Sequence, residues 1–177
     1  MVNATRTAII VPVADVEAFV APYREVLDHT AAWAVPAHIT VLYPFVAPGL
    51  LTDDVLDEVR GCVSTMPAFT ATFARVDWFR DEVLWLAPEP EAPFRALTEA
   101  AGRRFPDHPP YGGAYPDVIP HLTVGSKPLA EDGALRRAAV DLQAKLPVTA
   151  RIDRVSVIAG ADAPGSWHTV AEFLLPA

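Results

Sequence analysis

One short pattern occurs twice in the chain, at equivalent points of two halves that repeat the same order of elements. The sequence reads HITV at 38–41 and HLTV at 121–124, and a proline lies just ahead of each copy. Apolar spacing predicts strand, helix, strand, helix, strand in each half. This duplication predicts two similar lobes related by an approximate two-fold axis.

The spacing of apolar residues predicts the elements: every second residue in a strand, and every third or fourth residue in a helix. Strands are expected at 7–13, 38–43, 69–79, 83–87, 121–125, 148–158 and 167–175, and helices at 16–27, 52–66, 94–105 and 135–146. Asp15 and Thr52 are candidate N-caps, and Pro22 is expected to kink or restart the first helix. The stretch 106–120 has no periodicity and is expected to be a long functional loop.

The fold class predicted from this order is α+β. We expect two pseudo-two-fold-related sheets, each backed by helices, with a central groove between them. Short links such as 80–82 favour mixed or antiparallel sheets. Residues 1–177 are expected to form a single bilobal domain, with lobes at approximately 1–80 and 81–177 and strands free to exchange between them.

Composition limits the class of protein. The chain has 177 residues, 51% of them hydrophobic, which is enough to bury a core. Its apolar runs are too short or too broken by proline to span a bilayer, and we expect no membrane partner and a cytoplasmic location. Cys62 is the one cysteine, so no disulfide forms within the chain. The net charge of −8 argues against a long nucleic-acid-binding surface, although a few local groups still suffice for a nucleotide or an RNA end.

Alternation along a strand places both polar residues of each pattern on one face. Residues i and i+2 share a face, so His38 lies with Thr40 and His121 lies with Thr123, while the apolar residues between them point into the core. A polar face on an apolar strand needs water or internal partners. The approximate two-fold axis would bring both pairs into the central groove.

Two histidines facing one groove suit displacement at phosphorus. One group takes a proton from the nucleophile and the other gives one to the leaving oxygen, and the ordinary pKa of histidine suits both tasks. The threonine hydroxyls are then donors to the phosphate oxygens. A metal site is not indicated, because neither motif contains a histidine pair at ligand spacing, a cysteine pair or a carboxylate. No phosphate-binding loop for ATP is present either, so no cofactor is expected.

Both motifs, in the contexts AHITVLYPF and IPHLTVG, resemble those of the two-histidine (2H) phosphoesterase superfamily, and most closely its 2′-5′ RNA ligase-like branch, which includes RNA cyclic phosphodiesterases. The resemblance implies a bilobal α+β enzyme that hydrolyses 2′,3′-cyclic phosphodiesters of RNA ends or small nucleotides without metal, or joins RNA 2′-5′ reversibly. It also implies that His38 and His121 are catalytic and that Thr40 and Thr123 bind phosphate. One departure from the pattern is that no arginine cluster stands beside either motif in the sequence.

Further substrate contacts are suggested by position. Tyr111 and Tyr115 precede the second motif and are candidates for stacking on a base, with anchoring of the loop as the alternative. Lys127 follows the strand that carries the second motif and is a candidate phosphate contact. The competing function for the whole chain is a non-catalytic binder of cyclic nucleotides or RNA ends in the same groove. Two intact histidines favour the enzyme, because binding alone tolerates the loss of one.

Overall fold

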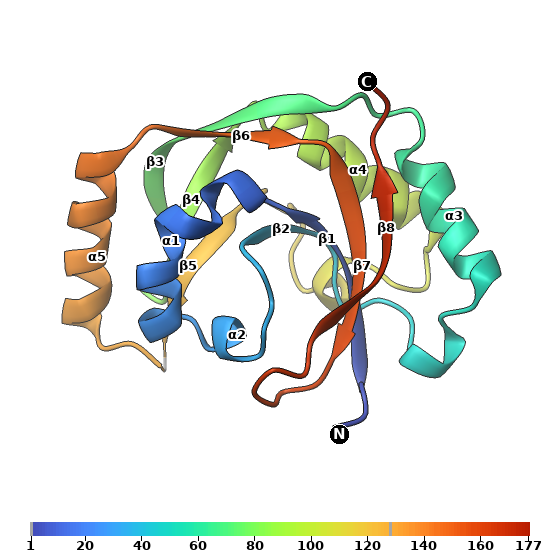
Figure 1. The fold of residues 1–177 in the computed structure, drawn as a ribbon, viewed down its shortest axis with the longest axis horizontal. Coiled ribbons are helices and arrows are strands. Elements are labelled where there is room, and N and C mark those ends of the chain that lie inside the picture. Colours follow the sequence, from blue (N-terminus) through green and yellow to red (C-terminus); the bar gives the residue numbers. More distant parts are fainter. Residues whose placement is uncertain (1, 128) are drawn as a thin grey trace.

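The computed structural model describes residues 2–127 and 129–177, and within them the chain forms two four-stranded sheets (Figure 1). Their strand orders are β2-β1-β7-β8 and β5-β4-β3-β6, and every pairing among these strands is antiparallel. The strands are β1 (Arg6–Pro12), β2 (His38–Leu42), β3 (Phe69–Phe79), β4 (Val83–Glu89), β5 (Leu122–Ser126), β6 (Val148–Ile152), β7 (Arg154–Gly160) and β8 (His168–Leu174).

Helices cover the outer surfaces of the sheets. In Figure 1, α5 and α3 lie at opposite ends of the molecule, and α1 lies over β5. The α-helices are α1 (Ala14–Leu27), α2 (His29–Ala32), α3 (Asp53–Val63), α4 (Ala92–Arg104) and α5 (Asp132–Lys145), and the short 3₁₀ helices are η1 (Pro48–Leu50) and η2 (Pro110–Gly113). In the described part of the chain, no helix is both long enough and apolar enough to cross a membrane.

The two halves of the chain are interlocked. Strand β3 of the first half pairs with β4 and β6, whereas β7 and β8 of the second half complete the sheet of β1 and β2. The helices cross over as well, because α1 packs against β5 and α4 packs against β2. The expected α+β fold of two sheets backed by helices is confirmed, and strands and helices of both halves contribute to each side of it.

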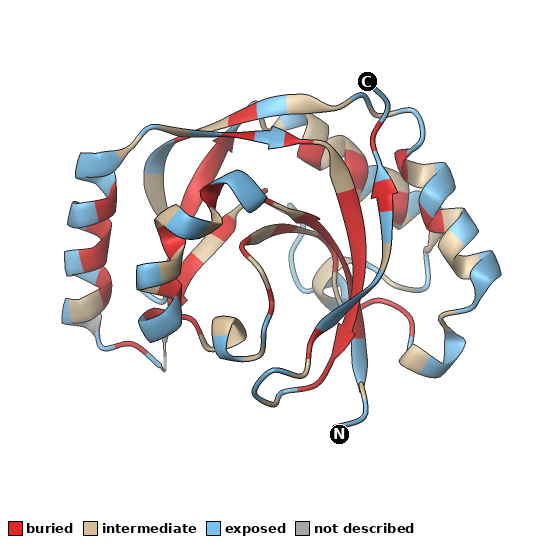
Figure 2. Ribbon diagram, in the orientation of Figure 1, coloured by how far each residue is buried: buried red, intermediate tan, exposed pale blue. Residues whose placement is uncertain are grey.

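The larger of the two apolar clusters found among the described residues joins the two sheets. It includes Ile39 and Val41 from β2 and Leu122 and Val124 from β5, all of them buried. Figure 2 shows buried residues along the central strands and on the inward side of α5. Because the residues between the polar positions of each motif are anchored in this core, the register of both strands is specified by burial.

The structure corrects several expectations about individual elements. The single strand expected at 148–158 is two strands, β6 and β7, which separate at Asp153 and lie in different sheets. Apolar residues lie at even positions from Val148 to Ile152 and at odd positions at Val155 and Val157, so the alternation shifts by one residue at the break. The expectation of one continuous strand overlooked this shift. Helix α1 begins at Ala14 after an N-cap at Val13 that makes no side-chain bond, so Asp15 is not the cap; its carboxylate accepts from the N–H of Arg151 instead.

The cap expected at Thr52 is confirmed, whereas the restart expected at Pro22 does not occur. The Thr52 side chain caps α3 by accepting from the N–H of Val55. Helix α1 continues through Pro22, which is exposed, so water can satisfy the carbonyl that the proline leaves without its usual partner. The loop after α4 folds back onto the end of β2, where the N–H of Tyr111 donates to the carbonyl of Tyr43 at 2.6 Å.

Candidate active site

The first motif opens strand β2. His38 and Thr40 are half-buried, while Ile39 and Val41 are buried in the core. The alternation expected from the sequence is therefore confirmed for this strand. Strand β2 is an edge strand of its sheet, so only β1 pairs with it.

The second motif is built in the same way on β5. His121 lies immediately before the first residue of the strand, and His121 and Thr123 are half-buried while Leu122 and Val124 are buried. Strand β5 is the edge strand of the other sheet, and it lies against β2. The fold thus brings together the edges that carry the two motifs, although 83 positions separate their histidines (38 and 121) in the sequence.

Both histidines make the same local hydrogen bond. His38 Nδ1 lies 2.7 Å from the carbonyl oxygen of Pro36, and His121 Nδ1 lies 2.7 Å from the carbonyl oxygen of Ile119. A carbonyl only accepts, so each Nδ1 carries a hydrogen and donates it. The neutral form of each ring then has its lone pair on Nε2, and the cationic form has its second N–H there. Nε2 is therefore the atom of each ring that can take up or deliver a proton.

Burial lowers the pKa of both rings. For His38 the pKa falls from its ordinary 6.5 to about 4, mainly through burial. The positive charges of Arg24 and His121 lower this pKa further. The hydrogen bond to the Pro36 carbonyl and the negative charge of Asp28 oppose the fall. For His121, burial lowers the pKa and the hydrogen bond to a backbone carbonyl opposes this. Since the charge of His121 acts on His38, the two rings are near enough to influence each other's protonation.

Aromatic side chains surround His121. Its ring meets Phe79 edge-on at a centroid distance of 4.7 Å and lies 5.9 Å from Trp85. Phe79 and Trp85 are stacked on each other at 4.8 Å, and Trp85 lies directly opposite Thr123 in the β4–β5 pairing. This aromatic wall excludes water from one side of the ring, which is the environment that disfavours an imidazolium.

The loop before the second motif reaches the first motif. Burial raises the pKa of Tyr111, and an interaction with the Thr40 side chain opposes that change. Tyr111 has a φ of 52°, a left-handed conformation that is strained for a bulky side chain. Tyr115 packs edge-on against Tyr111 with ring centroids 5.7 Å apart and is 61% exposed. The structure therefore places Tyr111 beside Thr40, and Tyr115 lies against Tyr111 and faces solvent.

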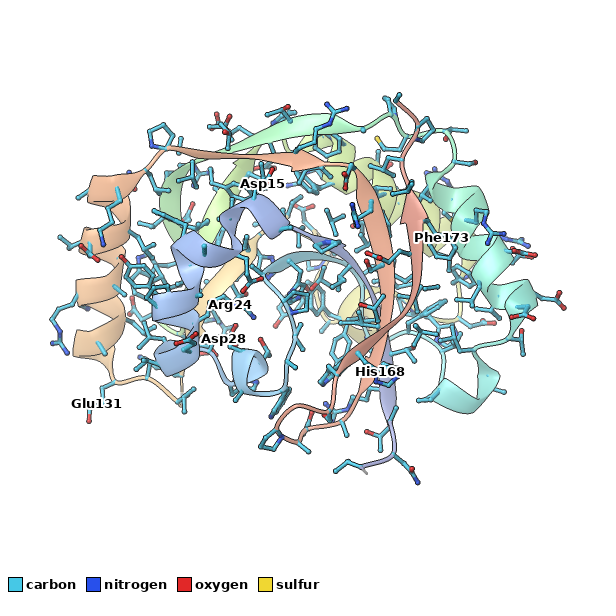
Figure 3. All side chains as sticks on the ribbon, in the orientation of Figure 1. Asp15, Arg24, Asp28, Glu131, His168 and Phe173 are labelled. Atoms are coloured by element: carbon cyan, nitrogen blue, oxygen red, sulfur yellow. The ribbon has the colours of Figure 1, made fainter. Side chains whose placement is uncertain are left out.

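Lys127 directly follows β5, and its N–H donates to the carbonyl of Glu82 at 2.9 Å. The three other histidines lie outside the motifs, and His108 packs edge-on against Phe45 at 6.0 Å. His29 packs edge-on against Trp33 at 4.6 Å, and His168 is exposed near the start of β8, where Figure 3 labels it. No group of three or more His, Cys, Asp or Glu side chains suited to hold a metal ion occurs among residues 2–127 and 129–177.

Sequence reasoning missed Arg24. The motifs have no arginine cluster beside them in sequence, but Arg24 is brought close to His38 by α1, with Asp28 next to it (Figure 3). A signal was present in the helix pattern, because Arg24 occupies a place in the apolar row of Val16, Val20 and Leu27. A charged residue within a buried row needs partners, and here they lie next to the first motif.

A family model described as the 2′-5′ RNA ligase superfamily matches residues 12–163, a range that includes both motifs. No curated protein sequence matches the chain. The fold is similar to that of E. coli LigT in a crystal structure with NADP+, with a TM-score of 0.63 and 16% identity over 99% of this chain and 100% of LigT.

Other solved structures agree. A crystal structure of LigT with 3′-AMP has the same TM-score, 0.63, at 16% identity and with 99% and 100% of the two chains covered. The protein TT0787 of Thermus thermophilus has a TM-score of 0.68 at 18% identity, with 96% of this chain and 97% of that chain covered. At such low identity these likenesses concern the fold, and they extend over nearly the whole length of each chain.

Proposed function

The chain belongs to the 2′-5′ RNA ligase superfamily, and from that premise we propose that it is a metal-independent phosphoesterase that opens 2′,3′-cyclic phosphodiesters of RNA ends or small nucleotides. His38 and His121 are the acid–base pair, and Thr40 and Thr123 bind the phosphate. With a 5′-hydroxyl in the place of water, the same groups would act in reversible 2′-5′ joining of RNA.

The observation that carries the proposal is the matched pair of Nδ1–H bonds to backbone carbonyls. This arrangement holds each ring in one tautomer, with Nε2 left as the proton-transferring atom. Acid–base catalysis on the two sides of one phosphorus requires two such atoms. The edges of β2 and β5 lie against each other, which supports placing both atoms at one substrate.

The surroundings of the two rings suggest which is the base. Arg24 disfavours a cation on His38, whereas no such charge acts on His121 among the causes of its lowered pKa. When the pair holds one proton, His121 therefore carries it. Neutral His38 takes a proton from the attacking water, and His121 gives its proton to the leaving 3′ oxygen. A P–O bond to water forms, the P–O3′ bond breaks, and the product is a 2′-phosphate with a free 3′-hydroxyl. The negative charge of the bound phosphodiester favours the protonated form of His121.

The polar groups on the same faces complete the site. The hydroxyls of Thr40 and Thr123 donate to the non-bridging oxygens, whose charge grows in the transition state. Tyr111 interacts with the Thr40 side chain and is proposed to direct its hydroxyl. Tyr115, exposed beside Tyr111, is proposed to stack on a base, and Lys127 to contact a phosphate.

A small nucleotide or a strand end is the proposed substrate class. The net charge of −8 disfavours a long nucleic-acid track. LigT has been crystallised with NADP+, 3′-AMP, ATP and phosphate, which supports a nucleotide as the ligand class for this fold. We therefore expect binding to be dominated by one phosphate and one base.

Turnover of 2′,3′-cyclic AMP in excess chelator tests the proposal, with the product identified by phosphorus NMR. We expect a 2′-phosphate from the native protein and loss of most activity in His38→Ala and in His121→Ala. The matched control is His168→Ala, since this exposed ring on β8 lies outside both motifs and should be dispensable.

Each other outcome has a definite meaning. Binding without turnover identifies a non-catalytic binder, and loss of turnover with chelator identifies a metal-dependent hydrolase. Near-full activity in His38→Ala together with a dead His121→Ala means that one histidine acts alone, and the two-histidine mechanism is then wrong.

A further inference from the structure

Each motif has an arginine on the helix that precedes it, and both arginines make the same bond. Arg24 of α1 donates from its guanidinium to the carbonyl of Val35 at 3.0 Å, three residues before His38. Arg95 of α4 donates to the carbonyl of Val118 at 3.1 Å, three residues before His121. Helices α1 and α4 occupy equivalent places in the two halves, each between a central strand and the edge strand that carries a motif.

Carboxylates fix both guanidinium groups. Arg24 is 2% exposed and is paired with Asp28 at 3.1 Å and with Glu17 at 3.5 Å. In Figure 3, Arg24 and Asp28 lie side by side at the end of α1.

Arg95 is held by Glu91 at 3.1 Å and by Asp117 at 2.7 Å. A guanidinium with two carboxylate partners has little freedom, because its donors lie in one rigid plane. Each arginine therefore presents a stationary donor to the backbone ahead of its motif.

The held carbonyl is adjacent to the one that orients the catalytic ring. Val35 precedes Pro36, whose carbonyl accepts from His38 Nδ1, and Val118 precedes Ile119, whose carbonyl accepts from His121 Nδ1. Fixing one peptide group restricts the rotation of the next one, and prolines restrict it further in both segments.

The backbone just before His38 is held by one further hydrogen bond. The N–H of Ala37 donates to Glu17 at 2.6 Å, and Glu17 is itself an ion-pair partner of Arg24. The peptide group that accepts from His38 through its oxygen is thus bonded through its nitrogen as well. The second segment has no such N–H, because the equivalent nitrogen belongs to Pro120.

We propose that Arg24 and Arg95 are a duplicated pair of positioning residues, each of which holds the backbone carbonyl next to the one that orients the histidine of its motif. This inference rests on the proposed function for its kinetic consequences, but the geometry it assigns is independent of the substrate. The two residues differ in one respect. Arg24 also acts on His38 by its charge, whereas Arg95 serves only geometry.

Arg95 is the better residue to test, because it is part-exposed and its removal leaves no buried charge behind. In Arg95→Met we expect kcat on 2′,3′-cyclic AMP to fall by roughly ten- to a hundredfold with little change in KM, as for a small misplacement of a reacting group. Arg95→Lys should recover part of this loss. Arg103→Met on the same helix is the control, since Arg103 is exposed and forms a surface ion pair with Glu99.

Nitrogen NMR of the imidazole rings reads out geometry without turnover. In the native protein both catalytic rings should hold hydrogen on Nδ1, and in Arg95→Met the signal of His121 alone should change toward a mixture of tautomers. If wild type shows no turnover, the proposed function fails, yet this spectrum still decides the positioning role. An unchanged His121 spectrum in folded Arg95→Met overturns the inference, as does an unchanged kcat in an active enzyme.

Arg24→Lys gives the complementary result. It keeps the positive charge near His38 but cannot reproduce the planar set of bonds to Asp28 and the Val35 carbonyl. We expect a lower kcat and an unchanged acidic limb of the pH profile. A normal kcat together with an unchanged acidic limb would mean that Arg24 acts on His38 only through its charge, and the pairing with Arg95 would then be wrong.

Discussion

Replacing His38 with glutamine should make the fold lose less stability in acid. Burial lowers the pKa of this ring from 6.5 to about 4, so the native state prefers it neutral. The unfolded chain takes up a proton on the ring as the pH falls through about 6.5, whereas the native state resists until about 4. More protons are then bound in the unfolded state, and stability falls with pH through this window.

The size of the effect follows from the interval between the two pKa values. At about 1.4 kcal/mol per unit of pH, the interval from 6.5 to about 4 corresponds to roughly 3 kcal/mol. Integration over the window places about 2.5 kcal/mol of this between pH 7 and pH 4.5. Carboxylates also titrate over that range, but their contribution is common to the native protein and the variant.

Urea unfolding at pH 7 and at pH 4.5 measures the difference directly. The decrease in the free energy of unfolding should be about 2.5 kcal/mol smaller in His38→Gln than in the native protein. His168→Gln, at an exposed ring, should reproduce the native decrease. An equal decrease in His38→Gln and the native protein would refute the reasoning, and the choice of His38 as the base would lose its physical support.

Three further predictions concern the site and the fold. Thr40→Val or Thr123→Val should lower kcat by roughly ten- to a thousandfold while the circular dichroism spectrum is retained, as for loss of one donor to a developing oxyanion; unchanged rates would remove the threonines from the site. The profile of kcat/KM against pH should be bell-shaped with its maximum below 6.5, because burial lowers the pKa of both His38 and His121, and a maximum above pH 7 would contradict this. Gly160→Ala should lower the free energy of unfolding in urea by about 1 to 3 kcal/mol, because the added methyl group would overlap a buried indole ring; an unchanged midpoint would show that the ring can move away.

The alternation of the two motifs could be read from the sequence because burial enforces it. Ile39 and Leu122 are fully enclosed by the core, so a shift of register by one residue would bury a histidine in their place. The doubled order of strands and helices was equally visible, since each element carries its own apolar period. These local signals were sufficient for the fold class and for the choice of His38 and His121 as candidates.

The assignment of strands to sheets could not be read in this way. The strand expected at 148–158 divides at Asp153 because β6 pairs with β3 while β7 pairs with β1, and these partners lie far away in the sequence. The apolar alternation of the segment shifts by one residue at this point, but it does not reveal which strands the two parts pair with, because those contacts depend on the whole fold. The same holds for Arg24, whose partners at the first motif are known only once α1 is packed.

The duplication also poses a chemical problem, which tertiary neighbours resolve. Two identical motifs with identical Nδ1 bonds would give two equivalent histidines, but an acid and a base must differ in protonation. The difference comes from outside the motifs. His38 lies near the charge of Arg24, which disfavours its cationic form, whereas no such charge is among the causes that lower the pKa of His121. A repeated scaffold thus supplies two proton-transferring atoms of the same geometry, and unlike neighbours assign the single proton to one of them. If this argument is correct, Arg24→Met should raise the pKa of the base and shift the acidic limb of the pH profile upward, while Arg95→Met leaves that limb in place.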